Sequence, residues 1–117
     1  MAFYDLELWR IKNSVGVFCE KKTNPGYYGT PRFDYFIHGQ SVIIRMTTSY
    51  WKNKSQTIYH DIAKLTYVRT RATWSLYWMR GGGKWERYPP SDGITTLEEL
   101  VKQIESDSTR CFLNKPK

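Results

Sequence analysis

The sequence predicts an α+β fold: a five-stranded antiparallel β-meander flanked by an N-terminal and a C-terminal helix, both packed on one sheet face. Three observations lead to this prediction. Apolar residues recur at helical spacing near both ends, polar and apolar residues alternate through the middle, and turn-forming residues separate the alternating runs. A chain of 117 residues has the length of one domain, so we expect a single domain over residues 1–117.

Each predicted helix has one apolar stripe that can face a core. In the helix expected at residues 4–22, the stripe consists of Leu8, Ile11, Val15 and Phe18. In the helix expected at residues 96–106, it consists of Leu97, Leu100, Val101 and Ile104. The sequence Asn-Pro-Gly at 24–26 ends the first helix, and a short C-terminal tail follows the second.

The antiparallel sheet is expected between residues 32 and 88. Gly39-Gln40 fits a two-residue type II′ hairpin turn between the first two strands. This turn sets four cross-strand pairs, which are Ile37 with Val42, Tyr35 with Ile44, Phe33 with Met46 and Asp34 with Arg45. Three further strands are expected at 58–69, 73–80 and 84–88, and we assume three-residue turns at 70–72 and 81–83.

These turns decide which side chains share a face of the sheet. The more apolar face, which the helices should cover, carries Ala63, Leu65, Tyr67, Tyr77, Met79 and Trp85. The opposite face combines tryptophan, tyrosine and leucine with cations and should remain open as an interface. A shift of one residue in a turn would exchange the two faces.

The positive charge of the chain is concentrated in its middle. The formal net charge is +7, and residues 31–90 contain ten Lys or Arg against three Asp or Glu, together with twelve of the nineteen aromatic residues. Cations interleaved with aromatic residues are typical of nucleic-acid binding. The same residue types are also ordinary on strands, where long cationic side chains cover apolar surface. Charge alone therefore leaves both interpretations open.

Several classes of protein are disfavoured by what the sequence lacks. It has no apolar run of about 18 residues that could cross a membrane and no N-terminal secretory signal pattern. Cys19 and Cys111 are far apart, and we expect free thiols in a cytoplasmic protein. His38 and His60 lack the spacing of a metal-ligand pair, so we expect neither a metal nor a cofactor.

No catalytic constellation stands out, and we expect a protein that is not an enzyme. Phosphate-binding and nucleophile motifs are absent, and the Gly81–Gly83 run is explained by a hairpin turn, although its amides could also hold a phosphate. His60 and Asp61 are adjacent on a strand, so their side chains should point to opposite faces. We also considered a metal-dependent hydrolase or nuclease. Such an enzyme would need clustered acidic residues, which the basic segment does not contain.

Three segments resemble an uncharacterised bacterial family catalogued as domain of unknown function 3024. They are Gly39–Val42, Ala63–Val68 and the stretch WSLYWMRGGGKWERYPP at Trp74–Pro90. The resemblance is near full length, implies the same order of helix, sheet and helix, and carries no activity. The chain departs from the family pattern at Arg45 in the second strand and in the glycine-rich turn, and both departures make it more basic.

The first hypothesis is a non-catalytic protein whose open sheet face binds nucleic acid. Trp74, Trp78 and Tyr88 would stack on bases, and phosphates would be contacted by Arg45, Lys64, Arg80 and Lys84. The alternative is an interaction protein that buries the same tryptophan-rich face against a second copy or another protein.

Overall fold

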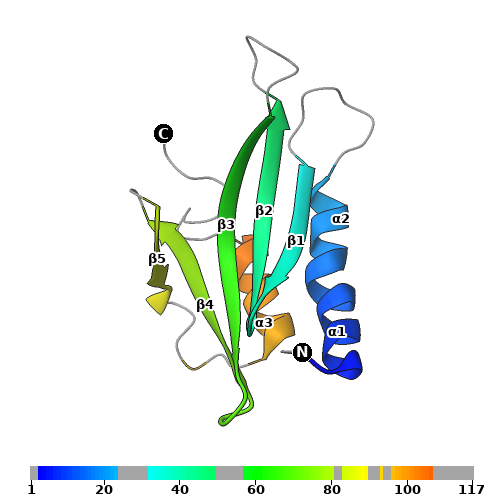
Figure 1. The fold of residues 1–117 in the computed structure, drawn as a ribbon, viewed down its shortest axis with the longest axis vertical. Helices are drawn as coiled ribbons and strands as arrows, with labels where there is room; N and C mark the ends of the chain where they lie inside the picture. Colours follow the sequence, from blue (N-terminus) through cyan, green and yellow to red (C-terminus); the bar gives the residue numbers. More distant parts are fainter. Residues whose placement is uncertain are drawn as a thin grey trace.

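The computed structural model describes residues 3–23, 32–49, 57–80, 83–89, 93 and 96–106. The elements occur in the predicted order of helix, five strands and helix (Figure 1). Their bounds are α1 (Asp5–Ile11), η1 (Lys12–Gly16), α2 (Val17–Lys22), β1 (Arg32–His38), β2 (Ser41–Ser49), β3 (Thr57–Val68), β4 (Thr73–Arg80), β5 (Lys84–Arg87) and α3 (Leu97–Ser106). The predicted loop at 24–31 and the tail at 107–117, which includes Cys111, lie outside the described residues.

The N-terminal helix is continuous from α1 through η1 to α2, and η1 is a π-helical turn in its middle. The apolar stripe of the sequence faces the core, because Ile11, Val15 and Phe18 are buried. Gly16 allows this helix to approach the sheet closely: a Cβ at that position would lie 3.3 Å from the ring of Tyr35. Larger side chains at residue 16 would push the helix away from β1.

The five strands form a meander in the order β1-β2-β3-β4-β5. The first hairpin has the predicted register, since Ile37 lies opposite Val42 and Tyr35 opposite Ile44. Gly39 in its turn has φ of +60°, a conformation that glycine adopts without steric cost. The prediction for this hairpin is confirmed.

The turn between β3 and β4 differs from the prediction. Val68 pairs with Thr73, so the turn contains the four residues 69–72 instead of three. Ala72 has φ of +52° and its N–H donates to the carbonyl of Arg69 at 3.2 Å, which closes this longer turn. The difference of one residue exchanges the faces of β4 and β5 relative to β3.

A β-bulge in β3 also changes which side chains share a face. Ile44 lies opposite Ala63, but the next residue, Arg45, lies opposite Asp61. Ile62 is therefore the extra residue of the bulge, and both Ile62 and Ala63 are buried. Below the bulge the alternation is reversed, so that Asp61 points to the face opposite the core.

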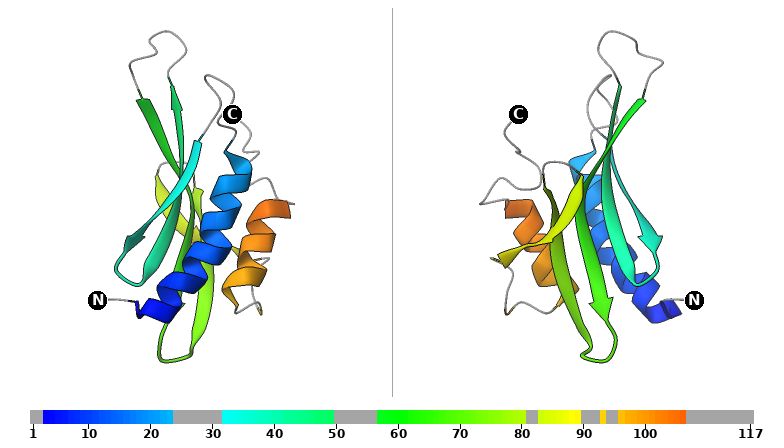
Figure 2. Two further views of the ribbon diagram at one scale, coloured as in Figure 1. Left: turned by 90° about the vertical axis from the view of Figure 1, so that its right-hand side faces the viewer. Right: turned by 60° about the vertical axis from the view of Figure 1, so that its left-hand side comes forward.

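Both helices lie on the same side of the sheet, as predicted, and leave its other face uncovered (Figure 2). The stripe of α3 is buried beside the N-terminal helix, and Phe3 stacks on Trp74 with their ring centroids 5.7 Å apart. The buried core also contains residues of the central strands, including Val42, Ile44, Leu65 and Leu76. We refer below to the covered face and the bare face of the sheet.

Candidate nucleic-acid interface

The seven residues predicted to form one site are divided between the two faces. Arg45 and Lys64 are on the bare face. Trp74, Trp78 and Tyr88 belong to the covered face, where Tyr88 is 1% exposed and Trp74 and Trp78 pack against the core. The prediction that these three aromatic residues share a face with Arg45 and Lys64 is wrong, because it depended on the three-residue turn at 70–72.

The last two predicted residues, Arg80 and Lys84, flank the turn of the β4–β5 hairpin. Arg80 pairs with Lys84 across the β4–β5 hairpin, and both are exposed. Strand alternation places them on the covered-face side together with Trp78. The Nε atom of Arg80 lies 3.7 Å from Oε2 of Glu86, so part of its charge is balanced.

One continuous row of side chains crosses the bare face from β1 to β5. Each residue of this row lies directly opposite the next one on the neighbouring strand. We call it the central row, and it consists of Phe36, Ile43, Lys64, Tyr77 and Arg87. The Nζ atom of Lys64 lies 5.7 Å from the centroid of the Tyr77 ring, within cation–π range. The row thus places an aromatic ring between two cations.

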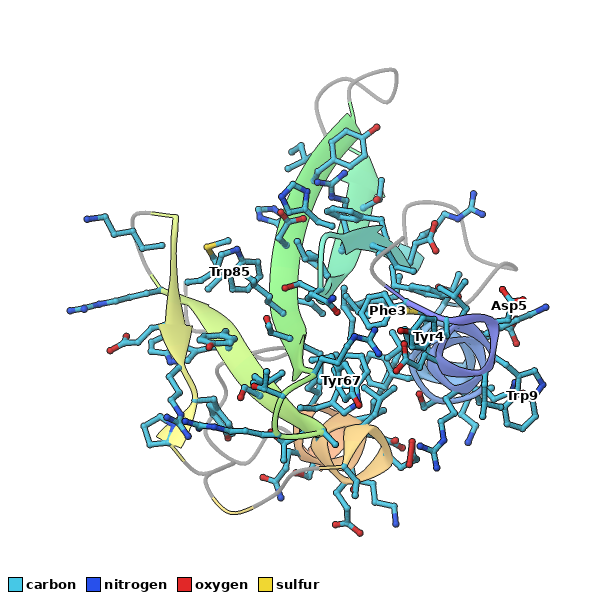
Figure 3. All side chains as sticks on the ribbon, turned by 60° about the horizontal axis from the view of Figure 1, so that its bottom comes forward. Phe3, Tyr4, Asp5, Trp9, Tyr67 and Trp85 are labelled. Atoms are coloured by element: carbon cyan, nitrogen blue, oxygen red, sulfur yellow. The ribbon has the colours of Figure 1, made fainter. Side chains whose placement is uncertain are left out.

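A second aromatic residue extends the bare face toward the edge of the sheet. Trp85 on β5 pairs with Met79 on β4, and both side chains are half-buried. Figure 3 shows Trp85 on the side of the sheet away from α3. In the same view Trp9 points outward from the N-terminal helix, on a different surface.

Arg45 belongs to a separate cluster on the bare face, beside the bulge. Its Nε atom donates to Oδ1 of Asp61 at 2.8 Å, and this hydrogen bond raises the pKa of Arg45. Its guanidinium carbon lies 4.6 Å from the ring centroid of Phe36 and 5.3 Å from that of Tyr59. The predicted pairing opposite Asp34 is confirmed, although the ion pair is made with Asp61.

Hydroxyl groups lie along the row next to the central row. Ser41 pairs with Thr66, and Thr66 pairs with Ser75. The hydroxyl oxygens of Ser41 and Thr66 are 2.8 Å apart and share a hydrogen bond. The bare face therefore places polar groups directly beside its aromatic and cationic side chains.

The sequence analysis missed four aromatic residues of the bare face, Phe36, Tyr59, Tyr77 and Trp85. Tyr77 and Trp85 were assigned to the covered face because of the turn. The alternation within β4 and β5 was sufficient to put Tyr77 and Trp85 on one face with each other. Phe36 carried a usable signal, since it interrupts the polar side of β1.

The remaining chemistry of the described residues is limited. They contain no group of three or more His, Cys, Asp or Glu side chains that could hold a metal. A groove of about 700 Å³ between α2 and β1 is lined in part by Cys19, Phe33 and Tyr35. Burial, with smaller effects from Asp34 and Glu20, raises the pKa of the Cys19 thiol to about 12, so this thiol stays protonated at neutral pH. None of the described helices is long and apolar enough to span a bilayer.

Comparison with protein-family models places the chain in a family. The family model described as "Domain of unknown function (DUF3024)" matches residues 3–114. No curated protein and no solved structure matches the chain.

Proposed function

The chain belongs to the DUF3024 family, whose description carries no activity, and from the geometry of the bare face we propose that it binds single-stranded nucleic acid. We further propose that the protein is non-catalytic and that it acts in the cytoplasm. The observation that carries the proposal is the central row, in which Tyr77 lies between Lys64 and Arg87 on a sheet face that none of the described helices covers.

The chemistry of this row suits a nucleotide chain. Bases stack on exposed aromatic rings without regard to sequence, while neighbouring cations contact the phosphates on either side. Strands are spaced by about 4.8 Å, so the backbones at Lys64 and Arg87 are separated by about 10 Å across Tyr77. Both side chains are long enough to bring their charges toward a base stacked on that ring. Trp85, two residues before Arg87 on the same face of β5, offers a second stacking surface.

The electrostatics of the chain support the same partner. Its net charge of +7 attracts polyanions, and release of counterions makes such binding weaken as salt rises. The attraction is focused on the part of the bare face around Lys64 and Arg87, because Asp34 on β1 and Asp61 on β3 flank Arg45. We therefore assign phosphate contacts to Lys64 and Arg87, and we withdraw that role from Arg45.

A second candidate is favoured by one observation. Met79 and Trp85 are both half-buried and give the bare face an apolar component on β4 and β5. Such a surface could also pair with a second copy around a two-fold axis. The mass of the free protein in solution separates this alternative from a monomeric nucleic-acid binder.

The proposal is tested by fluorescence anisotropy of a labelled oligothymidylate of about twelve nucleotides, measured over a series of salt concentrations. We expect Tyr77→Leu to weaken binding by about 5- to 100-fold, the effect of losing one stacked base. Lys64→Gln should reduce the slope of log affinity against log salt by about 0.7, the value for one phosphate contact with a single strand.

Two variants on other surfaces serve as matched controls. Lys102→Gln removes an exposed cation from α3, and Trp9→Ala removes an exposed aromatic ring from the N-terminal helix. Both should bind like the wild type. If all four variants bind equally, the sheet face is not the site. If the wild type is a dimer by light scattering and binds no oligonucleotide, pairing with a second copy replaces the proposal.

A further inference from the structure

The cluster around Arg45 contains an aromatic ring that the proposed site does not yet use. Tyr59 is on the bare face near the start of β3 and is 60% exposed. It lies opposite Thr47 of β2. A ring presented in this way has one side open for contact with a planar partner.

Arg45 lies between Tyr59 and Phe36 along β2. Phe36 is opposite Ile43, two residues before Arg45, and Tyr59 is opposite Thr47, two residues after it. The guanidinium contacts both rings and is fixed by Asp61 at 2.8 Å. Because a guanidinium is planar and its orientation is held by the carboxylate, it limits the positions that the Tyr59 ring can adopt.

The same surroundings make Arg45 a poor phosphate ligand. Asp61 is hydrogen-bonded to it, and Asp34 lies opposite it on the other neighbouring strand. A phosphate that approached Arg45 would meet two carboxylates and one guanidinium, which gives net repulsion. The charge of Arg45 is thus used within the protein.

We propose that Tyr59 is a second base-stacking position and that Arg45 is a positioning residue that holds its ring. This inference rests on the proposed binding of single-stranded nucleic acid and extends it along β3. Lys64 and Tyr59 are separated by about 13–17 Å along the strand, given a rise of about 3.3 Å per residue and one bulge residue. Tyr77 lies directly opposite Lys64, and stacked nucleotides rise by about 3.4 Å, so the two stacking positions are about four to five nucleotide steps apart.

The test compares two exposed tyrosines, each with an arginine over its ring. Tyr59 has Arg45 at 5.3 Å, and Tyr4, on the N-terminal helix away from the bare face, has Arg69 at 4.5 Å. We expect Tyr59→Leu to weaken binding of the twelve-nucleotide oligothymidylate by about 5- to 100-fold, while the salt slope stays at its wild-type value. Tyr4→Leu should bind like the wild type. Thermal unfolding of both variants checks that the fold is intact.

A charge-neutral double variant tests the role of Arg45. Arg45→Gln combined with Asp61→Asn removes one charge of each sign, so the net charge of the chain is unchanged. We expect weaker binding with an unchanged salt slope, because Tyr59 loses its support but no phosphate contact is lost. A slope reduced by about 0.7 would mean that Arg45 contacts phosphate and would overturn the inference.

The outcomes separate this inference from the proposed function. If the wild type does not bind the oligonucleotide, both fail. If Tyr77→Leu weakens binding and Tyr59→Leu binds like Tyr4→Leu, the proposed site stands and the second stacking position is wrong. If the inference is correct, the affinity of Tyr59→Leu also stops rising at a shorter oligonucleotide length than that of the wild type.

Discussion

The hydroxyl group of Thr23 forms two hydrogen bonds with the backbone of one residue, Phe33. It accepts from the Phe33 N–H at 2.8 Å and donates to the Phe33 carbonyl at 3.3 Å. β1 is an edge strand, and every second residue of an edge strand directs its N–H and C=O away from the sheet. The backbone N–H of Tyr35, two residues after Phe33, donates to Oδ1 of Asp34 at 2.8 Å. Side chains thus occupy edge groups to which a strand of another molecule could bind.

Replacement of Thr23 should destabilise the fold and open this edge. Thr23→Val has nearly the same shape but leaves the N–H and C=O of Phe33 without the hydroxyl, and we expect a loss of about 1–3 kcal/mol in the free energy of unfolding. Urea denaturation measures this loss, and light scattering detects the concentration-dependent association expected of an open edge. Thr23→Ser keeps the hydroxyl and should remain closer to the wild type. Equal stability of the two variants would contradict this role.

Two residues on opposite faces of β4 provide a test of the register. Leu76 is 1% exposed in the core, so Leu76→Ala should lower the free energy of unfolding by about 2–5 kcal/mol. Met79 is half-buried on the bare face, and Met79→Ala should cost about 1 kcal/mol or less. Chemical denaturation of both variants gives the comparison. A three-residue turn at 70–72 would reverse the order of the two effects.

The ion pair between Glu7 and Arg69 should make stability depend on acid pH. Arg69 donates to both carboxylate oxygens of Glu7, at 3.0 and 2.9 Å, and these hydrogen bonds lower the pKa of Glu7. A lowered pKa stabilises the folded state above the unfolded-state value of about 4.3, and this contribution is lost as the pH falls through the folded-state value. Glu7→Gln should therefore melt below the wild type at pH 7, and the difference should vanish at strongly acidic pH.

The control for this effect is Glu105→Gln, which removes an exposed carboxylate from α3. Its melting temperature should follow the wild type over the whole acid range. A difference between Glu7→Gln and the wild type that is independent of pH would show that the charge of Glu7 is not responsible.

The buried thiol of Cys19 should affect stability at alkaline pH. Its pKa is raised to about 12, so between about pH 9 and 12 the unfolded chain loses this proton while the folded chain keeps it. The free energy of unfolding then falls as the pH rises, with a contribution that approaches about 1.4 kcal/mol per pH unit. Cys19→Ala should show a shallower alkaline decline in urea denaturation. A decline as steep as that of the wild type would mean that the Cys19 thiol ionises in the folded protein.

Short-range patterns were sufficient to predict most of the fold. The helical stripes, the strand positions and the first hairpin each depend on residues close together in sequence, and the two-residue turn at Gly39 leaves little freedom in register. The turn between β3 and β4 was different. Arg69 could continue the strand by propensity, but it is held by Glu7, which is 62 residues away in the chain. No local pattern contains that contact.

The candidate site could be predicted only in part for the same reason. Arg45 and Lys64 were placed correctly on the bare face, since they depend on the first hairpin and on β3. The aromatic residues of β4 and β5 depend on the long-range turn, so Trp74 and Trp78 were exchanged for Tyr77 and Trp85. The prediction therefore gave the correct residue types for the site. It selected the wrong aromatic residues, because β4 has aromatic residues on both faces.

The bulge at Ile62 has a consequence for insertions and deletions in this family. Because a strand alternates with a period of two, an extra residue in a regular strand reverses the orientation of every side chain on one side of it. The bulge absorbs Ile62, so Asp61 still lies opposite Arg45. A relative that lacks this residue would need no bulge and would keep Asp61 and Tyr59 on the bare face. A relative that keeps the residue in a regular, unbulged strand would turn Asp61 and Tyr59 toward the helices, and Arg45 would lose both its carboxylate and one of its two rings.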